Sequence, residues 1–130
     1  IHTYGKLKFA MKKYHFTKAD AVPFELFGQL TGYEYNSAAE HPDCCLSYLE
    51  TQGAEHKLST CHTSDLFYYI LDGEADFSVG GKLFSVKATD AVLVPKGTTY
   101  GYAGTMKYVL FMTPAYTDGC ETRTDKSIYA

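Results

Sequence analysis

The 130-residue sequence predicts an all-β domain, built as an antiparallel sandwich or barrel. Short runs rich in β-branched and aromatic residues recur along the chain, which is typical of strands. Turns containing glycine or proline separate these runs about every eight to twelve residues, as in antiparallel β architectures. Hydrophobic residues make up 45% of the chain, which is enough to form the core of a single domain. We therefore expect one domain over residues 1–130, with its core at 42–114.

The N-terminal third has the weaker signals. Lysines alternate with apolar residues over 6–12, which predicts an edge strand that a second copy of the chain covers or exchanges. Alternatively, the natural chain starts at Met11 and residues 1–10 are extraneous. The segment 17–27 indicates a short helix or turn that Pro23 limits, and a loop-rich stretch follows it.

The later segments predict a regular series of strands and turns. Hairpin turns are expected at Asp72-Gly73 and at Gly80-Gly81, and Pro95–Gly97 predicts a bend. The tail from Ala115 is polar, so we expect it on the surface or against a partner chain. The expected strands are 44–50, 55–62, 66–71, 76–79, 82–86, 91–94, 98–102 and 107–113.

Charge and cysteine usage exclude several classes of partner. The net charge is −3 and the basic residues are scattered, so neither a nucleic acid nor a membrane surface is an expected partner. No apolar run approaches the length of a membrane span, and the N-terminus lacks a secretory signal. The cysteines, Cys44, Cys45, Cys61 and Cys120, form no C-x-x-C pair. Reduced thiols in a cytoplasmic protein are the simplest interpretation.

Residues 53–114 resemble the cupin superfamily in the spacing of two motifs. The positions of the first motif are Gly53, Ser59, Cys61, Leu66 and Gly73, and those of the second are Asp90, Pro95, Gly97 and Tyr100. The resemblance implies a double-stranded β-helix, the jelly-roll barrel of cupins. Residues 94–98 and 107–115 are similar to the ethanolamine-utilisation cupins, which implies a metal-independent barrel and a homodimer.

The metal positions of the family hold other residue types in this chain. Metal-binding cupins converge three histidines and one glutamate on a divalent ion, and here Ser59, Cys61, Leu66 and Tyr100 stand in their places. Serine and leucine do not supply the imidazole and carboxylate ligands that such an ion needs. We therefore expect no metal and no other cofactor. A register slip that turns Asp65 inward would reopen the possibility of a metal site.

Strand alternation places a set of polar side chains inside the barrel. They form a predicted ligand site for a small polar or aromatic metabolite: Ser59, Cys61, Tyr68, Tyr100 and Tyr102. The tyrosines could instead pack the core with bonded hydroxyls.

Tyr100 and His62 are the candidates for proton transfer. Alternation nevertheless places His62 on the face opposite to Cys61, as expected of a surface histidine, and the same alternative applies to His56.

These residues are compatible with three functions. The first is a binding or accessory cupin in a catabolic pathway, without chemistry of its own. The second is a metal-independent isomerase, epimerase or lyase that uses tyrosine and histidine. The third, a metal-dependent oxygenase or lyase, requires Asp65, His56 or His62 to converge.

Overall fold

The computed structural model describes residues 13–130, and its regular structure is almost entirely β. A 3₁₀ turn, η1 (Lys18–Asp20), precedes eight strands. These are β1 (Val22–Leu26), β2 (Leu30–Glu34), β3 (Cys45–Cys61), β4 (Asp65–Val79), β5 (Lys82–Lys87), β6 (Ala91–Val94), β7 (Thr99–Thr113) and β8 (Glu121–Arg123). Within 13–130, no helix is long and apolar enough to cross a membrane.

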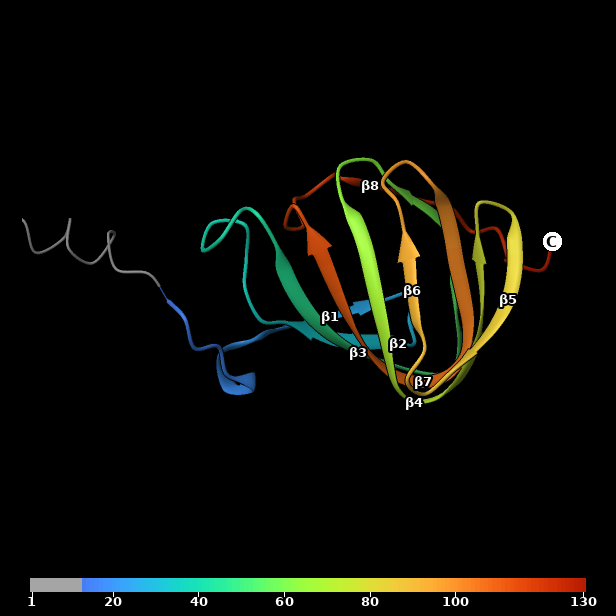
Figure 1. Cartoon of the computed structure of the whole chain (residues 1–130), viewed down its shortest axis with the longest axis horizontal. Helices are drawn as coiled ribbons and strands as arrows, with labels where there is room; N and C mark the ends of the chain where they lie inside the picture. Colours follow the sequence, from blue (N-terminus) through green and yellow to red (C-terminus); the bar gives the residue numbers. More distant parts are fainter. Residues whose placement is uncertain (1–12) are drawn as a thin grey trace, which may run out of the picture.

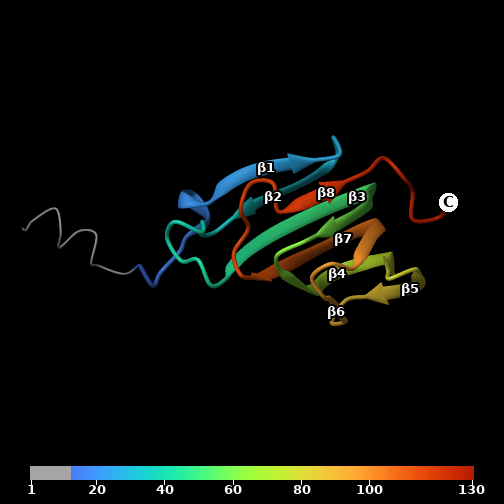
Figure 2. The ribbon, with the colours of Figure 1, turned by 90° about the horizontal axis from the view of Figure 1, so that it is seen from above.

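Three long strands make up the body of the molecule. β7 lies between β3 and β4 and pairs antiparallel with both along almost its whole length. Figures 1 and 2 show all three as strongly curved ribbons, so that the sheet folds back on itself. The all-β jelly-roll architecture expected from the sequence is confirmed.

The curvature divides the sheet into two faces of one barrel. We call residues 45–51, 65–71 and 105–113 of the long strands, with β1, β2 and β6, the first half-sheet. The remaining parts of β3, β4 and β7, with β5 and β8, form the second half-sheet. Inward side chains of both half-sheets form the core.

Bulges and glycines bend the long strands at one level. The β3–β7 register shifts between Gln52 and Ala54, where Gly53 has φ = +67°. The β4–β7 register shifts between Ile70 and Asp72, next to Gly73 with φ = +89°. Bulges bend a strand and increase its twist, and glycine accepts positive φ at little cost. The long strands therefore bend next to glycines, the residues with the widest range of allowed backbone conformations.

Several expected boundaries were wrong. Asp72-Gly73 is not a hairpin turn, because β4 runs through it while staying paired to β7. The expected strands 44–50 and 55–62 fall within β3 except for their end residues Cys44 and His62, and 98–102 and 107–113 fall within β7 except for Thr98. The strand 91–94 and the turn at Gly80-Gly81 are confirmed.

The segments expected to be irregular contain three further strands. Residues 17–27 hold η1 and β1, and β2 occupies part of the expected loop. The tail contains β8, which pairs with β3. The edge strand expected over 6–12, and the alternative start at Met11, lie outside the described residues.

Candidate active site

A cavity of about 230 Å³ opens between the two half-sheets. Inward side chains of β3, β4 and β7 form its interior, β1 and β2 cover one side, and the tail supplies the rest. Its walls are mainly aromatic and aliphatic, with few polar groups. The lining residues are Val22, Phe24, Leu26, Glu34, Ser47, Leu49, His56, Leu66, Tyr68, Tyr100, Tyr102, Leu110, Met112, Tyr116, Glu121 and Arg123.

Three of the five predicted ligand-site residues line this cavity: Tyr68, Tyr100 and Tyr102. All three are buried, and Tyr102 contacts Tyr68 edge to face. Ser59 and Cys61 are also buried but lie outside the lining. The Ser59 hydroxyl donates to the carbonyl of Lys57 at 3.0 Å.

The cavity contains an imidazole that belongs to His56, which is 2% exposed. Its ring stacks on Tyr102 with centroids 4.9 Å apart and lies 5.0 Å from the ring of Tyr100. Buried positions in β3 are odd-numbered up to Thr51, even-numbered at Ala54 and His56, and odd-numbered again from Ser59. Each bulge of β3 shifts the inward positions by one residue. If inward positions are counted back from Ser59 by alternation, without the bulge, His56 is wrongly placed on the outer face of β3.

The structure does not bring His62 to Tyr100. The His62 side chain is exposed, and its Nε2 lies 2.8 Å from the Thr122 hydroxyl on β8. Its backbone N–H donates to the carbonyl of Cys120. The imidazole in reach of Tyr100 is that of His56.

Tyr100 links His56 to a carboxylate that sequence reasoning did not select. The Tyr100 hydroxyl donates to Glu121 Oε2 at 2.7 Å and lies 3.3 Å from His56 Nε2. On its other side, His56 Nδ1 lies 2.9 Å from the Lys57 carbonyl oxygen. The polar atoms thus form a chain from the β3 backbone through the imidazole and the phenol to Glu121.

Counting hydrogens shows what this chain of polar atoms can do. A carbonyl oxygen only accepts, so in the neutral ring Nδ1 carries the hydrogen and Nε2 keeps its lone pair. The single hydrogen of Tyr100 can point to Nε2 or to Glu121, but not to both. One added proton satisfies both contacts, because an imidazolium Nε2 donates to the phenol while the phenol donates to Glu121. The arrangement therefore has a place for one proton taken from a ligand.

Burial favours the uncharged forms of these groups. Burial lowers the pKa of His56, and the nearby carboxylate of Glu121 only partly opposes the effect. Burial, followed by repulsion from Glu121, raises the pKa of Tyr100 well above its usual range. Around neutral pH the imidazole is therefore a free base and the phenol keeps its hydrogen.

The tail positions the carboxylate. Glu121 and Arg123 alternate along β8, so both side chains face the cavity, and their Oε1 and Nε atoms are 2.9 Å apart. Residues beyond β8 continue along β3, where the Lys126 carbonyl accepts from the Leu58 N–H at 2.9 Å. The E-x-R alternation was the one available signal for this strand. β8 is only three residues long, and its sequence has no apolar pattern.

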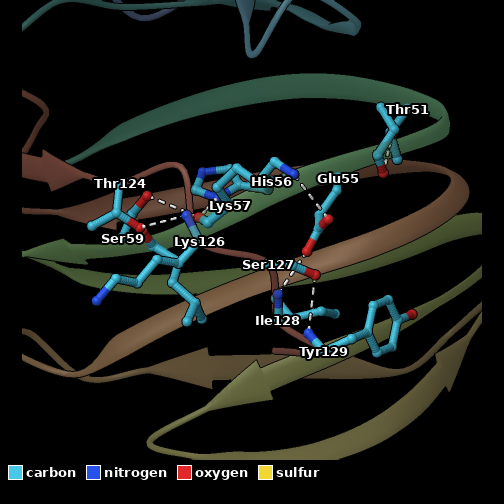
Figure 3. A network of polar contacts seen from close by, with 12 residues as sticks. Thr51, Glu55, His56, Lys57, Ser59, Thr124, Lys126, Ser127, Ile128 and Tyr129 are labelled. Carbon is cyan, nitrogen blue, oxygen red and sulfur yellow. Dashed lines mark hydrogen bonds and ion pairs between the residues drawn. The ribbon is translucent and has the colours of Figure 1, made fainter.

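A partly exposed carboxylate, that of Glu55, fastens the tail to β3. Glu55 Oε2 accepts a hydrogen bond from the backbone N–H of Ile128 at 2.6 Å, and the Ile128 side chain is buried. Figure 3 shows Ser127 and Ile128 beside Glu55, with Lys126 and Thr124 next to Lys57 and Ser59. Burial alone would raise the pKa of Glu55, but bonds from Ile128, Ser127 and Lys57 outweigh it and lower that pKa. We call residues 124–130 the C-terminal strap.

The fold and this inward-facing site define a small barrel protein of the cupin family. The family model described as a cupin domain matches residues 47–112, and the chain belongs to that family. A search of curated proteins finds no significant match.

Solved structures support the fold. Streptomyces PAC13 with uridine has a TM-score of 0.80 and 23% identity, and the match covers 91% of this chain and 97% of that chain. Another structure with the same identity and coverage, at a TM-score of 0.79, describes Pac13 as a nucleoside dehydratase. KdgF from Halomonas sp. has a TM-score of 0.72 and 14% identity, covering 82% and 98%. The nearer resemblance to ethanolamine-utilisation cupins stays a prediction.

The residues at the cupin metal positions do not fit a metal ion. Leu66 and Tyr100 line the cavity, but neither side chain carries an imidazole or a carboxylate. Ser59 and Cys61 lie outside the lining. Asp65 is exposed, and its Oδ1 accepts from the Lys96 backbone N–H at 2.9 Å. Within 13–130, no three His, Cys, Asp or Glu side chains come together closely enough to hold a metal ion.

Proposed function

We propose that this cupin binds a small, planar, hydroxylated metabolite without a metal and moves a proton on it, as a lyase or isomerase. The observation that carries the proposal is the contact of His56 Nε2 with the Tyr100 hydroxyl, which is itself bonded to Glu121, at the wall of an apolar cavity. Because the Tyr100 hydroxyl can donate to Glu121 instead, the lone pair of His56 Nε2 is left available to a ligand.

The chemistry begins with the lone pair of His56 Nε2. When Tyr100 donates to Glu121, this nitrogen is free to take a proton from an acidic C–H of a ligand. In a dehydration, the C–H electron pair forms a double bond as a hydroxyl leaves the neighbouring carbon. The imidazolium returns the proton to that hydroxyl, so one water is released and the enzyme is restored. In an isomerisation, the proton returns to a different carbon instead.

The cavity favours a ligand with a flat ring and a polar portion. Aromatic side chains on several strands offer stacking surfaces, and about 230 Å³ lies below the range for drug-sized ligands. Arg123, Glu34 and Ser47 provide the polar contacts. A nucleoside has these features, and PAC13, a similar fold, has been solved with uridine. Variants of PAC13 with a tyrosine replaced by phenylalanine have also been solved with uridine. A nucleoside or a similar sugar derivative is therefore the proposed ligand class.

The test incubates the wild type and variants with uridine, other nucleosides and related sugars. Binding is followed by titration calorimetry, and loss of water or isomerisation by mass spectrometry and NMR. We expect His56→Gln to lower turnover roughly 10²–10⁴-fold, the usual range for a general base. Tyr100→Phe should lower turnover while keeping the ligand bound. His41→Gln, at an exposed histidine of the same chain, is the matched control.

His62→Gln separates the two candidate imidazoles, because only the sequence-based hypothesis requires His62 for turnover. Wild-type turnover in His56→Gln would reject the proposal. A ligand that binds both wild type and His56→Gln and is changed by neither would instead support the binding-only function. A catabolic setting and a cytoplasmic location remain part of the proposal. The resemblance to ethanolamine-utilisation cupins supports the first, and the cysteine usage supports the second.

A further inference from the structure

We propose that Phe27 is a positioning residue for His56, because its ring covers the imidazole and keeps water away from it. Phe27 lies in the turn between β1 and β2, at residues 27–29. The proposal rests on the proposed function, in which the neutral ring of His56 is the base. It adds to that site a residue that lies outside the cavity lining.

The aromatic rings packed against His56 come from two parts of the fold. β7 supplies Tyr100 and Tyr102. The β1–β2 turn supplies Phe27, whose ring centroid lies 4.8 Å from that of the imidazole, with the two planes at 62°. This is the edge-to-face arrangement that aromatic pairs favour. Phe27 thus covers a side of the imidazole that β7 leaves open, and it takes none of the space that the cavity offers a ligand.

The pairing of β3 explains why this turn reaches His56. On the edge of β3 that β7 does not use, β2 pairs with residues 47–50 and β8 pairs with residues 59–61. Figure 2 shows the β1–β2 hairpin and β8 on the same side of β3. His56 lies in the interval between the two pairings. Because β2 is antiparallel to β3 and starts just after the turn, the turn extends along β3 toward this interval.

Phe27 holds a backbone conformation that a bulky residue disfavours. Phe27 and Gly28 have φ values of 51° and 78°, and the Gln29 N–H donates to the Leu26 carbonyl at 3.3 Å. A turn with positive φ at both central residues favours asparagine or glycine at the first of them. Strained residues of this kind cluster at functional sites, where the surrounding structure holds them. The ring contact with His56 is an interaction that asparagine or glycine could not make.

Phe27 acts on the imidazole through water access and not through charge. The ionisable groups that face the imidazole are Tyr100 and Tyr102 on β7 and Glu121 and Arg123 on β8. Burial has the largest effect on the pKa of His56 and lowers it, while the carboxylate raises this pKa and the guanidinium lowers it. Burial keeps both phenols neutral by raising their pKa. The turn contributes no ionisable side chain. An uncharged replacement of Phe27 therefore removes only the cover, and the pKa of His56 should rise toward the ordinary value near 6.5.

The test follows the titration of His56 by NMR in the full chain without any ligand. The ring signal of His56 is the one missing from His56→Gln. Phe27→Asn and Phe27→Gly suit the positive φ but lack the ring, so each should raise the pKa of His56 above the wild-type value. Phe27→Leu keeps an apolar cover and should raise it less. Circular dichroism checks the fold, and each of the first two variants covers a folding failure of the other.

Phe67→Asn is the matched control, because Phe67 is 48% exposed on β4, which β7 separates from β3. It should leave the pKa of His56 at the wild-type value. An unchanged pKa in both Phe27→Asn and Phe27→Gly would overturn the proposal, as would an equal rise in Phe67→Asn.

Turnover gives a second readout that a merely structural role would not move. The acid limb of the pH profile should shift to higher pH in Phe27→Asn by the same amount as the pKa of His56, because only the neutral ring accepts a proton. A wild type that changes none of the nucleosides or sugars would count against the proposed function alone. The titration needs no ligand, so it would still decide whether Phe27 keeps water from His56.

Discussion

At the residue scale, the protonation of His56 makes stability depend on pH. The pKa of His56 is lowered in the folded chain because the ring is buried, whereas the unfolded chain has an ordinary imidazole pKa near 6.5. Between these two values the unfolded state binds the extra proton and the folded state does not. The free energy of unfolding should therefore fall as the pH drops below about 6.5, and the His56 contribution should level off below the folded pKa.

Urea unfolding of wild type and His56→Gln across this pH range measures that contribution as the difference between two slopes. The free energy of unfolding of His56→Gln should not show the decrease at low pH that is assigned to His56. Turnover should fall in the same direction, because only the neutral ring accepts a proton. Parallel pH slopes for the two proteins would show that His56 titrates alike in the folded and unfolded chains.

Sequence reasoning found the tyrosines of the site but not its imidazole. Tyr68, Tyr100 and Tyr102 lie on segments whose alternation is regular, so their inward direction could be predicted. His56 lies between two bulges of β3, and a bulge leaves no reliable mark in a single sequence. Glu121 was missed because a three-residue strand has too short a pattern to recognise.

At the element scale, the long strands depend on glycines at their bends. A Cβ on Gly73 would lie 2.1 Å from the Thr105 carbonyl oxygen, and the residue has φ = +89°. Gly53 also has positive φ, but no atom lies within 4 Å of a Cβ placed there. We expect Gly73→Ala to lower the free energy of unfolding by about 3 kcal/mol or more, because steric overlap adds to backbone strain. Gly53→Ala should cost about 1–2 kcal/mol from backbone strain alone.

Urea unfolding of both variants measures this difference. Equal losses would mean that β4 moves away from β7 at little cost and that the close approach does not hold the bend. The same glycines explain why the strand boundaries were predicted wrongly from the sequence. Asp72-Gly73 has the composition of a hairpin turn. However, β4 stays paired with β7 on both sides of it, so the strand bends there without reversing direction.

The β1–β2 hairpin shows a different limit of sequence reasoning. Pro23 and the glycines at 28 and 32 indicate irregular structure by local preference, but β2 pairs with β3 and buries Leu30 fully. Phe27 takes a positive φ of 51° in the connecting turn, which local preference does not favour. Tertiary contacts with the cavity wall thus outweigh local preference in this segment.

At the scale of the whole molecule, the chain end completes the barrel. β8 brings Glu121 and Arg123 to the cavity, and the C-terminal strap then binds along the outer edge of β3. Gly101 makes this close approach possible, since a Cβ there would lie 2.7 Å from Ile128 Cγ2. The carboxylate in the candidate site therefore depends on contacts made several residues later in the chain.

The strap can be tested through Glu55, whose replacement by alanine leaves the Ile128 N–H without its acceptor. We expect Glu55→Ala to lower the free energy of unfolding at neutral pH by about 1–3 kcal/mol. It should also weaken turnover or ligand binding, because β8 loses its anchor. The lowered pKa of Glu55 implies that its contribution is complete above the ordinary carboxyl range, near pH 4.5, and is lost as the pH falls through the folded value.

Glu74→Ala, at an exposed carboxylate on β4, is the matched control and should change stability by no more than about 0.5 kcal/mol. Urea unfolding at neutral and acid pH gives the stability, and hydrogen exchange at Ile128 and Leu58 reports the position of the strap directly. Protection of both amides should decrease in Glu55→Ala but not in Glu74→Ala. If protection and binding are unchanged in Glu55→Ala, pairing of β8 with β3 holds Glu121 by itself, and the strap has no part in building the site.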